Sequence, residues 1–148
     1  MHLTTAHYNL KAEAAHINLS PELFRLGARD YFKSFARFEH RKFSPVPFFL
    51  CCRAMELALK AVHLESKKQS EVKQLFSHDL MKCYKGLDKS KQTLSAEELD
   101  LLSAANEIYV RKEFEYLNVV HAVTAYKRFP DLDALVKLAK KIIRYDAS

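Results

Sequence analysis

The chain has very little glycine and proline, with two glycines and four prolines among 148 residues. The glycines, Gly27 and Gly86, stand alone, so no glycine-rich loop is available to cradle a phosphate group. All-β and dinucleotide-binding α/β folds need more turn residues than this chain offers. Alternation of apolar and polar residues, the mark of strands, is also missing at convincing length. These absences favour an all-α fold.

Cysteines and long apolar runs are scarce as well. Cys51 and Cys52 are adjacent and, with Cys83, give neither a disulfide framework nor the C-x-x-C spacing of zinc sites. No histidines form an HExxH pair, so neither a metal nor a cofactor is predicted. The uncharged run that includes residues 44–52 is too short to span a bilayer, and the first residues lack signal-peptide features. We therefore expect a reduced, cytoplasmic protein without a membrane segment.

The remaining composition limits the size and charge of the fold. With 49% hydrophobic residues, the chain can build one domain with a full core. We expect residues 20–148 to form this domain and residues 1–19 to be weakly ordered or to hold a short helix. Lys and Arg number 24 against 18 Asp and Glu, a net charge of +6. This balance is compatible with a polyanionic partner but does not require one.

The most apolar stretch covers residues 45–64, and it predicts a helix at the centre of a bundle. Its ionisable members are Arg53, Glu56, Lys60 and His63, which lie along one line of the helix. Two interpretations of this line remain open. It either faces solvent through a gap, with a weak Glu56–Lys60 pair, or lines a cleft in which Arg53 binds an anion.

Helix signals recur on both sides of this segment. Ser20-Pro21-Glu22 is a helix start, and the helix is expected to carry Leu23 on its inner face and to end near residue 41. A capping box of Ser95 and Glu98 starts a helix that we expect to reach residue 116. Further helices are expected at residues 70–76, from 77–80 onward, and at 131–145. The sequence therefore predicts an antiparallel up-and-down bundle of four to five helices.

Two groups of side chains have both a structural and a functional interpretation. Basic residues step by four along the first helix, forming either a solvated face or a contact for a nucleic-acid backbone. They are Arg25, Arg29, Lys33 and Arg37, followed by Arg41 and Lys42. In the second group, Ser77 caps a helix and Asp79 favours its positive end. Alternatively, His78 beside the Asp79 carboxylate transfers protons.

Two stretches together resemble a known family. C-C-R-A-M-E-L-A-L-K-A (residues 51–61), followed by S-H-D-L-M-K-C-Y (residues 77–84), resembles the xELxLKA…HDL signature of the HEPN superfamily. N-E-I-Y-V-R-K-E-F-E-Y (residues 106–116) and Pro130 with the last helix match the same pattern. The resemblance implies a helical bundle that pairs into a homodimer with its cleft at the interface. Many such domains are metal-independent ribonucleases of toxin–antitoxin and phage-defence systems, and others are non-catalytic nucleotide- or RNA-binding modules.

The catalytic members of that family carry an Arg-x4-6-His motif late in the bundle. The matching arginine here is Arg111, but Tyr116, Leu117 and Asn118 stand where the histidine belongs, and the next histidine is His121. A metal-free ribonuclease needs a group that titrates near neutral pH, and tyrosine, with a pKa of about 10, is a poor substitute. The resemblance therefore favours a binding function over a catalytic one.

The sequence thus predicts a HEPN-like, homodimeric binding module for RNA or nucleotide phosphate, in a toxin–antitoxin or defence setting. The predicted phosphate-binding residues are Arg111, Arg53, Lys60 and His78, supported by Glu56, Asp79, Tyr109 and Tyr116. Two alternatives remain. One is an endoribonuclease toxin that uses Tyr116 or His78, and the other is an oligomerisation protein whose interface contains Phe32, Phe35 and Phe38. A nucleotidyltransferase or an antitoxin is a candidate partner.

Overall fold

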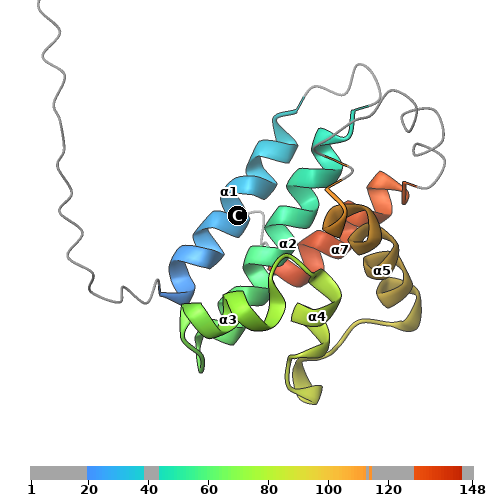
Figure 1. The fold of residues 1–148 in the computed structure, drawn as a ribbon. Coiled ribbons are helices and arrows are strands. Elements are labelled where there is room, and N and C mark those ends of the chain that lie inside the picture. Colours follow the sequence, from blue (N-terminus) through green and yellow to red (C-terminus); the bar gives the residue numbers. More distant parts are fainter. Residues whose placement is uncertain (1–19, 39–43, 113, 115–128, 145–148) are drawn as a thin grey trace, which may run out of the picture.

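The computed structural model describes residues 20–38, 44–112, 114 and 129–144. Within these ranges the chain forms α-helices and one short 3₁₀ helix and no strand, which confirms the all-α helical bundle (Figure 1). The elements are α1 (Pro21–Ala36), α2 (Val46–Leu64), α3 (Gln69–Phe76), α4 (Leu80–Lys85), η1 (Lys89–Lys91), α5 (Ala96–Val110) and α7 (Leu132–Ile143). The four longest of the described helices are α1, α2, α5 and α7. The expectation for residues 1–19 falls outside the described residues.

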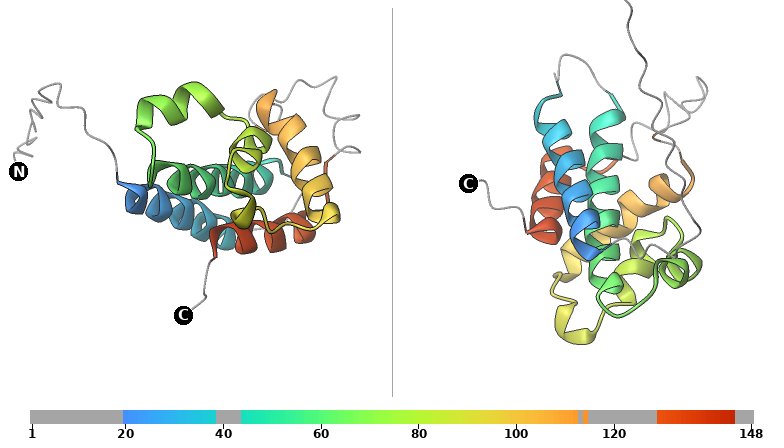
Figure 2. Two further views of the ribbon diagram at one scale, coloured as in Figure 1. Left: turned by 90° about the horizontal axis from the view of Figure 1, so that it is seen from below. Right: turned by 90° about the vertical axis from the view of Figure 1, so that its left-hand side faces the viewer.

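Helix α2 occupies the centre of the bundle, as its apolar sequence predicts. It contacts all five other described α-helices, and no other described helix does so. Helix α1 lies alongside it in the opposite direction, while α3 and α7 lie on opposite sides of this pair (Figure 2). Cys51, Cys52, Ala54 and Met55 are completely enclosed. An apolar helix of this kind is stable only where neighbours remove nearly its whole circumference from water.

Helix α5 starts at the predicted capping box, whereas the cap of α7 was not predicted. The Ser95 hydroxyl accepts a hydrogen bond from the Glu98 amide at 3.1 Å, and Glu98 Oε2 accepts one from the Ser95 amide at 2.8 Å. Asp131 caps α7 by accepting from the Ala134 amide. The prediction for Ser77 is wrong, because Asp79 is the N-cap of α4. Ser77 instead ends α3 with a φ of 49°, where its hydroxyl does not cap the next helix.

Two helices end earlier than their apolar periodicity indicates. Helix α1 ends at Ala36 rather than near residue 41, and α5 ends at Val110 rather than near residue 116. After α5, Lys112 adopts a φ of 59° and its amide donates to the Tyr109 carbonyl, which stops the helix. Glycine is the usual residue at such a left-handed position after a helix, so a lysine there does not indicate from the sequence that the helix ends.

The inner face of α1 also differs in part from the expectation. Leu23 is 51% exposed, because it lies across the helix from the buried Ala28 and Phe32. Phe32 is one of the residues expected at an oligomer interface, but it is buried in the core of the protomer. A side chain already enclosed by its own chain cannot contribute surface to a second copy without unfolding.

Candidate functional site

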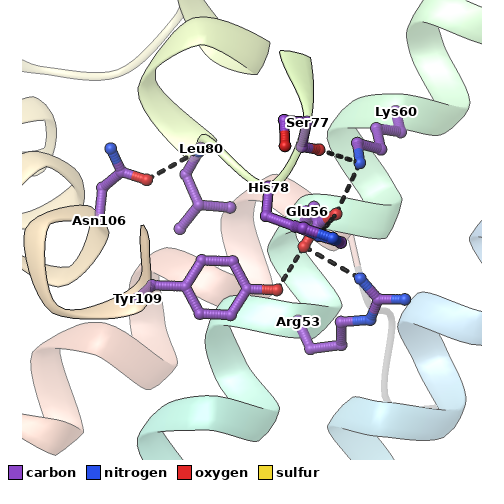
Figure 3. A network of polar contacts seen from close by, with 8 residues as sticks. All are labelled: Arg53, Glu56, Lys60, Ser77, His78, Leu80, Asn106 and Tyr109. Atoms are coloured by element: carbon purple, nitrogen blue, oxygen red, sulfur yellow. Dashed lines mark hydrogen bonds and ion pairs between the residues drawn. The ribbon is translucent and has the colours of Figure 1, made fainter. Parts of the chain in front are cut away.

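Glu56 is the polar centre of the bundle, and its side chain is 0% exposed. Its Oε1 accepts hydrogen bonds from Lys60 Nζ at 2.6 Å and His78 Nδ1 at 2.9 Å. Its Oε2 accepts from Arg53 Nη1 at 3.1 Å and from the Tyr109 hydroxyl (Figure 3). The partners come from α2, from the turn between α3 and α4, and from α5. A carboxylate this deep in a protein needs such partners to keep its charge.

These partners set the charge state of Glu56. Burial alone would raise the pKa of this carboxyl, but hydrogen bonds from Lys60 and Tyr109 and the charges of Lys60 and Arg53 hold it below its ordinary value of 4.5. Burial and the adjacent carboxylate raise the pKa of Tyr109, so its phenol stays protonated and donates. Burial disfavours the charge on Arg53, yet Glu56 outweighs it and raises the pKa of Arg53. The anion of Glu56 therefore lies beside the two basic side chains of Arg53 and Lys60.

The turn between α3 and α4 is held from both sides. From α2, Lys60 Nζ donates to the Ser77 carbonyl. From α5, Asn106 Oδ1 accepts from the Leu80 amide at 2.8 Å, and Asn106 Nδ2 donates to Asp79 Oδ1 at 3.0 Å. These bonds hold the unusual positive φ of Ser77 in place. The turn therefore places its histidine in a fixed position over the buried carboxylate.

His78 is the most accessible member of this network, with 61% of its side chain exposed. An ionised carboxylate can only accept hydrogen bonds, so the Nδ1 that faces Glu56 carries a hydrogen. In the neutral ring the lone pair is then on Nε2. Nε2 can take a proton from a ligand, or donate to an anionic oxygen when the ring is protonated.

Two hollows meet at Arg53 and His78. The larger has a volume of about 690 Å³ and lies between α1, α2, α4 and the end of α5. Its lining includes three aromatic rings (Tyr31, Phe49, Tyr109), the cations Arg53, Lys82 and Lys112, and His78 and Asp79. The smaller hollow, of about 300 Å³, extends toward α3 and is lined by Lys60 and Glu56 among others. The polar line of α2 thus borders a cleft, and the interpretation as a solvated seam is wrong.

One member of that line, His63, takes no part in this site. Its ring is buried, its Nε2 donates to the Cys83 carbonyl at 2.8 Å, and it packs on the Phe76 ring with centroids 4.1 Å apart. Burial lowers the pKa of His63, so the ring is neutral at physiological pH. His63 therefore joins α2 to α4 inside the core and is not available to a ligand.

Of the two remaining predicted residues, Arg111 and Tyr116, the structure describes the first. Arg111 is exposed at the C-terminal cap of α5, and it is not among the described residues that line either hollow. Its neighbour Lys112 does line the larger one, because the left-handed turn at the helix end directs the chain there. Tyr116 lies outside the described residues.

Sequence reasoning missed five residues of the site. They are Tyr31, Phe49, Lys82, Lys112 and Asn106. Lysines and partly buried aromatic residues are common on helices, so nothing set the first four apart. Asn106 carried a usable signal, since an amide among apolar residues in the middle of a helix disfavours the helix unless it has a tertiary partner.

Other chemistries find no support in the described part of the chain. Its residues include no group of three or more His, Cys, Asp or Glu side chains arranged to hold a metal ion. None of the described helices combines the length and apolarity needed to cross a membrane. Burial raises the pKa of the Cys51 and Cys83 thiols to about 12, which makes them unreactive at neutral pH. Comparisons with protein-family models, curated proteins and solved structures gave no match.

Proposed function

We propose that the chain is a non-catalytic binding module for RNA or nucleotide phosphate, and that the larger hollow is its binding site. The supporting observation is the joint presence of cations and aromatic rings around one opening of about 690 Å³. Cations bind phosphate oxygens, and aromatic rings stack on unpaired bases. The one carboxylate in the lining, Asp79, already accepts hydrogen bonds from the Lys82 amide and from Asn106. The cations that line the hollow therefore outnumber its carboxylates.

The arrangement of the two sequence signatures supports a HEPN-like assignment within this proposal. Glu56 and Lys60 come from the ELALKA stretch and His78 from the HDL stretch, and the three side chains contact one another through Glu56. Residues far apart in the sequence thus share one site. A homodimer that closes the site, and a nucleotidyltransferase or an antitoxin as partner, belong to the same proposal.

RNA binding at different salt concentrations tests the proposed site. A fluorescent single-stranded RNA should bind the wild type with an affinity that falls as salt rises, by about 0.7 in log-log slope for each phosphate contact. The Lys82→Ala/Lys112→Ala variant should weaken binding and reduce this slope, because both lysines line the larger hollow. Fluorescence anisotropy gives both quantities.

The matched control is Lys85→Ala, which removes an exposed lysine from α4 that lines neither hollow. Its affinity and slope should equal those of the wild type. Arg111→Ala separates the larger hollow from the phosphate site that the sequence motif predicts, since it should weaken binding less than Lys112→Ala. An RNA affinity that none of these lysine changes alters would refute the proposed site.

A second candidate function, metal-independent RNA cleavage, rests on the pairing of His78 with Glu56. The carboxylate holds the imidazole with Nε2 ready to accept a proton, as a general base requires. In such a reaction Nε2 takes the proton of a 2′-hydroxyl, the 2′-oxygen bonds to phosphorus, and the bond from phosphorus to the 5′-oxygen breaks. The 5′-oxygen takes a proton from water, and the protonated imidazole later returns its own proton to the solvent. The products are a 2′,3′-cyclic phosphate and a 5′-hydroxyl end.

Analysis of RNA ends distinguishes the two candidates. RNA incubated with the protein in a chelator should stay intact if the chain only binds. Cyclic-phosphate ends that appear with wild type and disappear with His78→Ala would support cleavage instead. Tyr109 is not an alternative base, because its raised pKa keeps the phenol protonated.

A further inference from the structure

A separate hollow lies on the other side of α2 from His78. It is formed by α1, α2, the C-terminal end of α7 and the segment from Tyr84 to Leu94, and its volume is about 190 Å³. None of its lining residues lines the two hollows at His78. Figure 2 shows why, because α7 packs on the α1–α2 pair on the side away from α3. The proposed RNA site therefore makes no use of this hollow.

The floor of this hollow is apolar. Ala28, Ala58, Leu59 and Tyr84 are buried there, and Ile142 is partly exposed beside them. An apolar cavity of about 150 Å³ accepts a molecule of the size of benzene. The floor can therefore bury one large apolar side chain, but not an extended ligand.

The rim of the hollow is strongly cationic. Five cations from α1, η1 and α7 border the floor, against a single carboxylate, Glu65; they are Arg25, Arg29, Lys91, Lys141 and Arg144. This rim already binds three carboxylates of its own chain. Arg25 pairs with Glu22 and with Glu65, Lys91 Nζ lies 3.6 Å from Glu65, and Lys141 Nζ lies 2.7 Å from Glu98. Among the described residues, none forms an ion pair or side-chain hydrogen bond with Arg29 or Arg144.

We propose that this hollow binds a short acidic segment of a partner protein, with one large apolar side chain on the floor and carboxylates at Arg29 and Arg144. Charge complementarity identifies the partner as acidic, and the small apolar floor requires an anchor side chain. Cations from one element would be enough to bind a single small acid, whereas the cations around this hollow come from three elements. The rim therefore matches several carboxylates around one apolar group.

Selection from displayed random peptides tests the proposal even though the partner is unidentified. Peptides selected on the full-length protein should share one Phe, Leu or Ile with several Asp or Glu residues close to it. Their affinity should fall about tenfold or more in the Arg29→Glu/Arg144→Glu variant. It should also fall in Ile142→Ala, which reduces the floor without changing any charge. Fluorescence anisotropy with a selected peptide measures each affinity, and circular dichroism verifies folding.

Two control variants separate this proposal from the RNA site. Lys85→Glu/Lys137→Glu reverses two exposed cations outside the hollow and should leave peptide affinity unchanged. Lys82→Ala/Lys112→Ala should lose RNA affinity and keep peptide affinity, so either proposal can fail alone. The proposal is overturned if no acidic consensus is selected, or if the charge reversal at Arg29 and Arg144 has no effect. Displacement of the peptide by N-acetylphenylalanine at equal affinity, or by RNA in the Lys82→Ala/Lys112→Ala variant, also overturns it.

Discussion

Glu56 carries a full negative charge in the core, and its cost is offset by partners that reach it from three elements. Glu56→Ala would leave Lys60 and Arg53 close together without their shared anion. Breaking a buried pair in this way lowers the free energy of unfolding by about 3–5 kcal/mol, and we expect a loss of that size in urea denaturation. Glu65→Gln, whose carboxylate is half exposed, should cost less than about 1 kcal/mol. Equal losses in the two variants would contradict this account.

The decrease of the free energy of unfolding at acid pH gives a second test of the role of Glu56. The pKa of Glu56 is lower in the folded protein than its ordinary value of 4.5, so below that pH the unfolded chain binds more protons. Its stabilising contribution is complete above pH 4.5 and is lost as the pH falls through the lower pKa of the folded state. Glu56→Gln should therefore show a flatter decline of unfolding free energy below about pH 4.5. Urea titrations from neutral to acid pH measure it, and a decline as steep as that of the wild type would refute it.

At the scale of elements, local sequence patterns predicted where most helices lie, but they did not predict which helix surfaces pack against one another. The apolar run predicted α2 to within a residue, the capping box at Ser95 predicted the start of α5, and the amphipathic pattern of residues 131–145 predicted α7. These features depend on a few neighbouring residues, so the sequence carries them directly. The end of α5 depends on the left-handed backbone of Lys112, and no residue type there announces it.

The candidate site shows the same division. Spacings of three and four residues on α2 were enough to group Arg53, Glu56 and Lys60. The contribution of His78 depends on how α3 and α4 fold back over α2, and that of Tyr109 depends on the packing of α5. Such contacts between distant segments follow from tertiary packing, which periodicity does not encode.

The two glycines give a matched test of how helices pack on one another. A Cβ on Gly86, at the end of α4, would lie 2.7 Å from a ring carbon of the buried Phe76. Gly86→Ala should lower the free energy of unfolding by about 1–3 kcal/mol, because a buried ring has little room to move. A Cβ on Gly27, inside α1, meets only the tip of the Leu57 side chain at 3.1 Å.

Gly27→Ala should therefore raise stability by about 0.5–1 kcal/mol, since alanine favours a helix interior over glycine and the Leu57 tip can shift. Thermal denaturation of the two variants and the wild type measures both changes in stability. Changes of the same sign in both would show that glycine flexibility, rather than the distance to Phe76, decides the outcome.

For the whole molecule, α2 separates two surfaces of different chemistry. One side bears the buried Glu56 network and the hollows at His78, and the other bears the apolar hollow with its cationic rim. Because the two surfaces share no lining residue, changes at one should leave binding at the other intact. They still share one folding unit, since α2 contacts every other described α-helix.

Because α2 packs against every other described α-helix, we expect the protein to unfold in one cooperative transition. Met55 is 0% exposed on α2, and Met55→Ala removes contacts in the middle of the core, so we expect a loss of about 2–5 kcal/mol. The transition should remain a single one, with far-ultraviolet circular dichroism and tyrosine fluorescence giving the same midpoint. The chain has seven tyrosines and no tryptophan, so the fluorescence reports on tyrosines alone. Leu75→Ala, at an exposed position on α3, should change stability by no more than about 0.5 kcal/mol. If the two probes gave different midpoints in Met55→Ala, the outer helices would be stable without α2, and its central role would be wrong.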